Sequence, residues 1–269
     1  MSTPAQEQVR AQERAAWLAE TAFNALSAAR VSLGRAADVT REVDNYLRRS
    51  EEEIFELPVQ ANRVQTADEP RPFQRNAQEL ADQADQRIRY ARQGITEVRD
   101  RVADGGRALK AGRDALTELS ELPVQHDTAA MDRLSHQLNT LDAAVGNFTE
   151  SIDNADRRLI ATREALDPLV NSSSHVDNRQ AAAALITNAA QSADTQLMQT
   201  RAGLNTLNEA FEDTRGDSTQ ATAESAELAR TFHAAANPTP RTAQHHQQAA
   251  TEDAHKPKQS EIASRLRDL

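Results

Sequence analysis

The feature that most constrains this chain is a seven-residue repeat of apolar side chains running from Met131 to Leu169. Its two positions alternate in steps of three and four residues, so both fall along one narrow face of an α-helix. One position holds Met131, Leu138, Val145, Ile152, Leu159 and Leu166, and the other holds Leu134, Leu141, Phe148, Ala155, Thr162 and Leu169. Such a face must be covered by other helices to leave water, which predicts a packed bundle.

The same period recurs in three other segments. The first is rich in leucine and alanine, the second brings two glycines into the repeat, and the last gains threonine and serine in its second half. Because every gap between the segments contains proline or a polar run, we predict four separate helices. They span about residues 4–57, 73–121, 128–170 and 177–236.

Proline sets the expected boundary between the first two helices, because it lacks the amide donor and restricts the residue before it. We expect Pro58 to end the first helix. Pro70 and Pro72 should then keep residues 58–72 irregular. This would be the longest loop inside the bundle.

The fourth helix carries two local signals. Asp177, with Gln180 three residues later, has the spacing of a capping box and should begin the helix. Gly216 could break it; the repeat continues through Gly216, which favours a kink instead.

The predicted fold is all-α: an elongated antiparallel four-helix bundle over residues 1–236, with coiled-coil-like heptad packing. An aromatic content of 3% is too low for a typical large globular core, which agrees with long helices. Residues 237–259 form a polar, histidine-containing linker that should be disordered, because it cannot bury enough apolar surface to fold.

The last ten residues, 260–269, regain a short amphipathic pattern. Ile262, Leu266 and Leu269 form one apolar stripe on a helix capped by Ser260. A tethered stripe of this kind suits binding in the groove of a protein partner. The alternative is that the peptide folds back onto its own bundle or is a frayed end.

If the first two helices fold back about a loop centred near residue 65, Trp17 should lie across from Gly112. The large side chain would then fill the space left by the missing one. Charges beside the repeat, such as Arg92, Arg99 and Arg113, should pair with acids on neighbouring helices. No carboxylate occupies a repeat position, so we expect none with a pKa raised by burial.

The net charge of −10 argues against a nucleic acid as the main partner. The absence of cysteine excludes disulfides and thiolate chemistry, and no signal peptide or membrane span is visible. Cytoplasmic location is therefore expected; export without a classical signal peptide is the alternative.

The sequence predicts no catalytic, cofactor or metal site. A di-iron bundle needs two Glu-x-x-His motifs projecting into its core, and only Glu252 with His255, in the polar linker, has that spacing. His245 and His246 could add weak metal binding there, although a solvated linker is the simpler interpretation.

The composition favours a non-enzymatic structural or interaction protein, a scaffold or adaptor that binds protein partners or itself as a homo-oligomer. The alternative is a leaderless exported protein or a targeting domain of a bacterial secretion system. A Tyr-x-x-x-Asp/Glu export signal would favour that alternative, but Tyr46 is followed at this distance by Ser50, and Tyr90 by Gly94.

Overall fold

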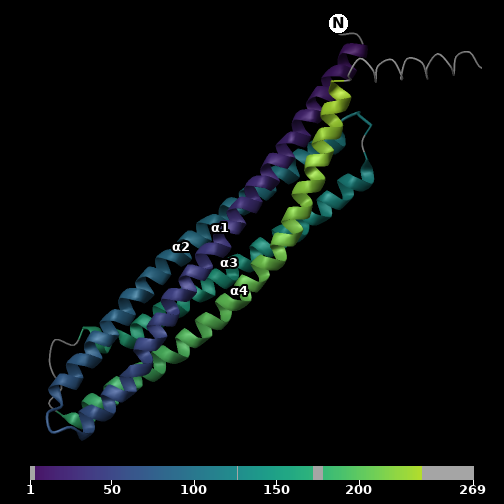
Figure 1. Cartoon of the computed structure of the whole chain (residues 1–269). Helices are drawn as coiled ribbons and strands as arrows, with labels where there is room; N and C mark the ends of the chain where they lie inside the picture. Colours follow the sequence, from purple (N-terminus) through teal and green to yellow (C-terminus); the bar gives the residue numbers. More distant parts are fainter. Residues whose placement is uncertain (1–3, 126, 172–177, 238–269) are drawn as a thin grey trace, which may run out of the picture.

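The computed structural model describes residues 4–125, 127–171 and 178–237. Within these ranges the chain forms long helices and no strand. The helices are α1 (Pro4–Thr66), α2 (Arg71–Glu121), α3 (Thr128–Val170) and α4 (Arg179–Ala236). They lie side by side in a rod (Figure 1), which confirms the predicted all-α bundle of four long helices.

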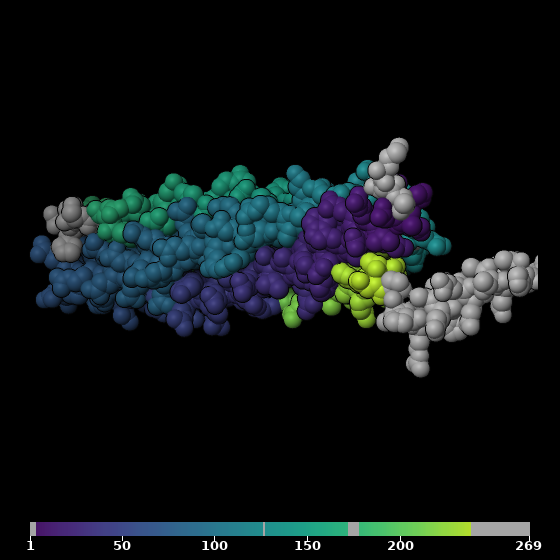
Figure 2. Space-filling view, turned by 90° about the horizontal axis from the view of Figure 1, so that it is seen from above, coloured from purple at the N-terminus to yellow at the C-terminus, as the bar shows by residue number. Residues whose placement is uncertain are grey.

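Consecutive helices run in opposite directions and the last closes the ring. α1 packs against α2 and α4, and α3 packs against the same two helices. At about 1.5 Å per residue, the 63 residues of α1 are about 95 Å long. The N-terminal end of α1 and the C-terminal end of α4 therefore lie at the same end of an elongated molecule (Figures 1 and 2).

The first helix does not end at Pro58, so that prediction is wrong. The apolar repeat continues beyond the proline, and Ala61 and Val64 are buried one heptad after Ile54 and Leu57. Proline inside a helix costs about 3 kcal/mol through a lost hydrogen bond and a steric clash. Burial of the two following turns against the bundle offsets that cost.

The predicted irregular stretch 58–72 is consequently wrong as well. Residues 67–70 alone connect α1 to α2. Pro72 lies in the first turn of α2, where a missing amide donor has no helical acceptor to lose.

The start of α4 is capped by Asn178, not by Asp177, which lies outside the described residues. The Asn178 side-chain oxygen accepts hydrogen bonds from the backbone amides of Gln180 and Ala181. α4 then continues through Gly216 without interruption, so the helix is not broken there. The predicted bounds of α3 agree with the structure.

The predicted contact between Trp17 and Gly112 does not form. Gly112 faces α1 at Ala25, and Trp17 is 51% exposed. Because α1 continues for nine residues past its predicted end, the connection between α1 and α2 lies further along the chain than expected. The residues of α1 therefore face those of α2 in a different register. In the observed register the side chain of Leu33 packs against Gly105.

The buried side chains form two clusters along the rod. The cluster of what we call the distal half includes Leu33 to Val64 of α1 and lies toward the connection between α1 and α2. The cluster of the terminal half includes Ala15 to Ala29 and lies toward the chain ends. Where the two meet, α4 contributes buried Thr214 and Ser218 in place of apolar residues.

Candidate interaction groove and the charged seams around it

Ion pairs run along the seam between α2 and α3. They join Asp85 to Arg163 (2.6 Å), Arg92 to Asp156 (2.8 Å), Arg99 to Asp153 (3.0 Å) and Arg113 to Asp142 (3.0 Å). The prediction that Arg92, Arg99 and Arg113 pair with acids on a neighbour is confirmed.

The order of charges along this seam fixes how α3 lies on α2. A slip of one heptad in one direction would place Asp85 against Asp156, and in the other direction Arg92 against Arg163. Both slips oppose like charges. The seam therefore selects one register, although each exposed pair adds only about 0.2–1 kcal/mol of stability.

The seam between α1 and α4 is joined through Arg201. Its guanidinium donates to Asp44 at 3.0 Å and also to Glu51, one heptad further along α1. The hydrogen bond to Asp44 is the main reason that the pKa of Arg201 lies above its usual value, and the charges of both acids add to the rise. Arg201 thus stays positively charged and joins α4 to two acids that lie one heptad apart on α1.

Two carboxylates in the distal half are buried, contrary to expectation. Glu53 is 8% exposed and Asp85 is 6% exposed. Asp85 accepts from Arg89 and Arg163, whereas one oxygen of Glu53 is 2.7 Å from Arg87 and the other is buried without a hydrogen-bond partner.

Burial raises the pKa of Glu53, and the nearby charge of Arg87 only partly offsets the rise. Both carboxylates occupy positions directly beside the repeat, which a neighbouring helix covers when it approaches closely. The small residues of the α1 and α2 repeats permit that approach. They are the feature of the sequence from which the burial of these two carboxylates could have been predicted.

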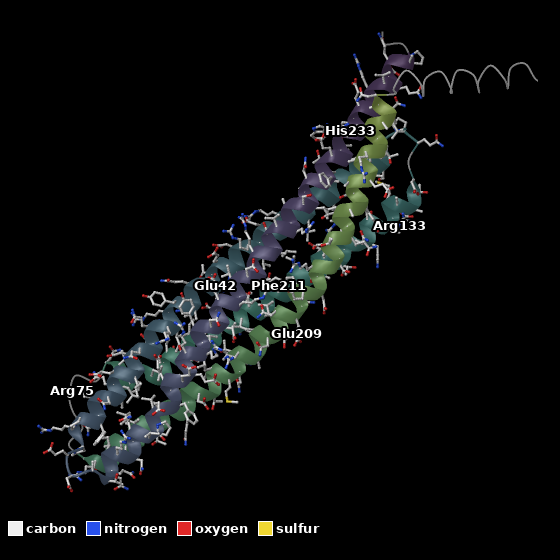
Figure 3. The ribbon with its side chains drawn as sticks, viewed as in Figure 1. Glu42, Arg75, Arg133, Glu209, Phe211 and His233 are labelled. Atoms are coloured by element: carbon white, nitrogen blue, oxygen red, sulfur yellow. The ribbon has the colours of Figure 1, made fainter. Side chains whose placement is uncertain are left out.

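A groove of about 450 Å³ opens between α1 and α4 near the middle of the rod. Figure 3 labels Phe211, one of its lining residues, at this level of α4. The lining residues are Ser27, Arg30, Val31, Leu33, Gly34, Arg35, Ala37, Asp38 and Arg41 of α1 and Phe211, Glu212, Thr214, Arg215 and Ser218 of α4.

The groove exists because the large side chains at this level turn toward other helices. Leu33 packs onto Gly105 of α2, and the ring of Phe211 lies 4.4 Å from that of Phe148 on α3, centroid to centroid. At Gly34 an added Cβ would meet no atom within 4 Å. Small residues are thus left on either side of the α1–α4 seam.

The groove carries an excess of positive charge. Arg41 binds Asp38 (2.8 Å) and Glu212, and Arg215 lies 3.6 Å from Glu212.

The side chains of Arg30 and Arg35 form no ion pair or hydrogen bond with any other residue that the structure describes. Both arginines are exposed, so an anion in solution can reach their guanidinium groups.

The sequence-predicted partner-binding residues, Ile262, Leu266 and Leu269, lie outside the described residues, as do the histidines of the polar linker. Within the described ranges no cluster of three or more His, Cys, Asp or Glu side chains has the geometry to hold a metal ion. None of the four helices is both long and apolar enough to span a membrane.

Comparison of the chain with protein families, curated proteins and solved structures finds no match.

Proposed function

We propose that the chain is a non-enzymatic interaction protein, a stiff rod that scaffolds or spaces protein partners. The observation that carries this proposal is the packing of four helices of 43 to 63 residues along the rod, with ion pairs that select their register. Such an assembly holds two points on its surface at a fixed separation of up to about 95 Å.

The outer surface supports contact with proteins. Phe55 of α1 is 75% exposed and Met198 of α4 is 57% exposed. Phe55 lies one turn after Glu51, and Met198 one turn before Arg201, which binds Glu51. Because α1 and α4 are antiparallel, Phe55 and Met198 lie at the same level, where exposed apolar side chains on neighbouring helices favour a protein contact.

The proposal includes two further elements that come from the sequence. Residues 260–269 act as a docking peptide through Ile262, Leu266 and Leu269. The role is exercised in the cytoplasm, in keeping with the cysteine-free sequence, either by single chains or by a homo-oligomer.

Quantitative co-purification from the native source tests the proposal. The full chain is compared with a chain lacking residues 260–269 and with the Phe55→Ser, Met198→Ser double variant. We expect each change to remove a defined subset of bound proteins, and sedimentation velocity separates self-association from binding of other proteins. A set of bound proteins that is the same for all three chains, and the same as for an unrelated helical rod, would contradict the interaction role.

A further inference from the structure

The groove between α1 and α4 has a mixed floor. Leu33, Ala37 and Phe211 provide buried apolar surface, and Thr214 and Ser218 add hydroxyl groups. These hydroxyls donate to carbonyls of their own helix, at 2.7 Å for Thr214 and 3.1 Å for Ser218. A hydroxyl oxygen that donates can still accept, so the floor can bind both an apolar side chain and a backbone N–H group.

The charges are arranged unequally along the groove. Toward Arg41 the charges are balanced, because this side chain binds Asp38 and Glu212. Arg30, toward the chain ends, and Arg35, near the middle of the groove, have no anionic partner for their side chains among the described residues. Guanidinium groups bind carboxylates through paired hydrogen bonds, so these two arginines favour an acidic ligand.

The length of the groove matches an extended peptide. From Ser27 to Arg41 the α1 wall rises by about 21 Å, and six residues of extended chain span about 20 Å. We infer that the groove binds an extended acidic segment of a partner protein, with apolar side chains on the floor and carboxylates on Arg30 and Arg35. This inference rests on the proposed interaction role and assigns one of its binding sites.

The chain's own C-terminal segment fits the groove less well. Residues 238–269 hold five lysine or arginine residues and four aspartate or glutamate residues, so they offer no net negative charge to the two arginines. A segment of another protein is therefore the occupant that the charges favour.

Fluorescence anisotropy with a labelled hexapeptide tests the inference on the full chain. The probe has two central leucines flanked by glutamates, and a second probe carries lysines in place of the glutamates. We expect saturable binding of the acidic probe alone, weakened as salt screens the charges. Equal binding of the lysine probe, or no binding of either, would overturn the inference.

The Arg30→Gln, Arg35→Gln double variant removes the two positive charges on which the inference depends. We expect it to bind the acidic probe at least tenfold more weakly than the parent chain. The matched control is Arg48→Gln, Arg49→Gln, which removes the same charge from two exposed arginines of the same helix outside the groove. An equal loss in both variants would mean that net charge, and not the groove, attracts the probe.

Filling the groove provides a second test that leaves all charges in place. Gly34→Phe should abolish binding, because a side chain added there enters open space in the groove. Gly203→Phe is the control, since that glycine is also open and lies outside the groove. Melting curves confirm that both variants fold, and unchanged binding in Gly34→Phe would overturn the inference.

Two outcomes separate this site from the wider proposal. If the groove fails its probe-binding tests while partners still co-purify with the chain, the groove site is rejected and the interaction role stands. If the chain still binds the acidic probe with the same affinity after residues 260–269 are removed, the groove acts independently of the C-terminal peptide.

Discussion

The two halves of the rod share one heptad repeat but fill it differently. In the distal half, buried isoleucine, leucine and valine are interspersed with single polar residues such as Ser50, Thr162 and Thr200, and ion pairs join neighbouring helices. From the junction of the two halves into the terminal half, α4 brings Thr214, Ser218, Thr222 and Ser225 to its buried face in close succession. Their hydroxyls are bonded within α4, so no hydrogen bond is lost, yet they bury less apolar surface. A continuous repeat can therefore encode unequal stability along one molecule.

The largest effect is expected from Leu159→Ala, at a fully buried position of the distal half. Deleting most of a buried leucine side chain loses transfer free energy and leaves a cavity, at a cost of about 2–5 kcal/mol. Urea unfolding should show a lower midpoint for the whole rod. A change confined to amide exchange in the terminal half would mean that the distal half does not control global unfolding.

Two glycines of α2 should respond to alanine in opposite ways. An added Cβ at Gly94, in the distal half, would lie 2.5 Å from Cγ2 of Val43, so Gly94→Ala should cost about 1–3 kcal/mol. At Gly112, in the terminal half, the nearest atom would be 3.5 Å away, and Gly112→Ala should gain up to about 1 kcal/mol from helix propensity. Thermal melting of the pair measures both signs, and destabilisation by both changes would refute the observed register.

The terminal half should be strengthened by Ser225→Ala. This buried serine donates to the Thr222 carbonyl of its own helix, so its removal strands no partner, and alanine has the higher helix propensity. We expect a gain of roughly 0.5–1 kcal/mol, seen as slower amide exchange from residue 221 onward. Unchanged exchange in this segment would show that the polar positions are not its weakness.

The smallest expected effect concerns pH and Glu53 in the distal half. Its pKa is raised in the folded chain above 4.5, so the folded state holds this proton more tightly than the unfolded state does. Its favourable contribution is fully present below about pH 4.5 and is lost as pH rises through the folded pKa.

Glu53→Gln should therefore raise Tm slightly at pH 7, and the difference from the parent should shrink toward pH 4. Melting curves across this range measure it. A variant that melts earlier at pH 7 would show that the ion pair with Arg87 outweighs the cost of burying the carboxylate.

The repeat was sufficient to predict the helical class, the bounds of α3 and the pairing of three α2 arginines, because these depend on which residues share a helix face. The prediction that Pro58 ends α1 is wrong because the burial of Ala61 and Val64, which continue the repeat, outweighs the local preference of proline. The error in the length of α1 then moved Trp17 out of register.

The groove could not be predicted from the sequence. It depends on which helices are neighbours and on the directions in which Leu33 and Phe211 point. Arg30 and Arg35 look like any exposed arginines until α4 is placed beside them.

The closure of the ring by α4 against α1 has a consequence for synthesis of the chain. One flank of α1 is covered by the helix that follows it, but the other waits for the last helix of the bundle. About 115 residues separate the end of α2 from the end of α4, which a ribosome translates in roughly 6 to 23 seconds at its usual rates. Throughout that interval the alanine- and leucine-rich flank of α1 remains open to chaperones and to other nascent chains.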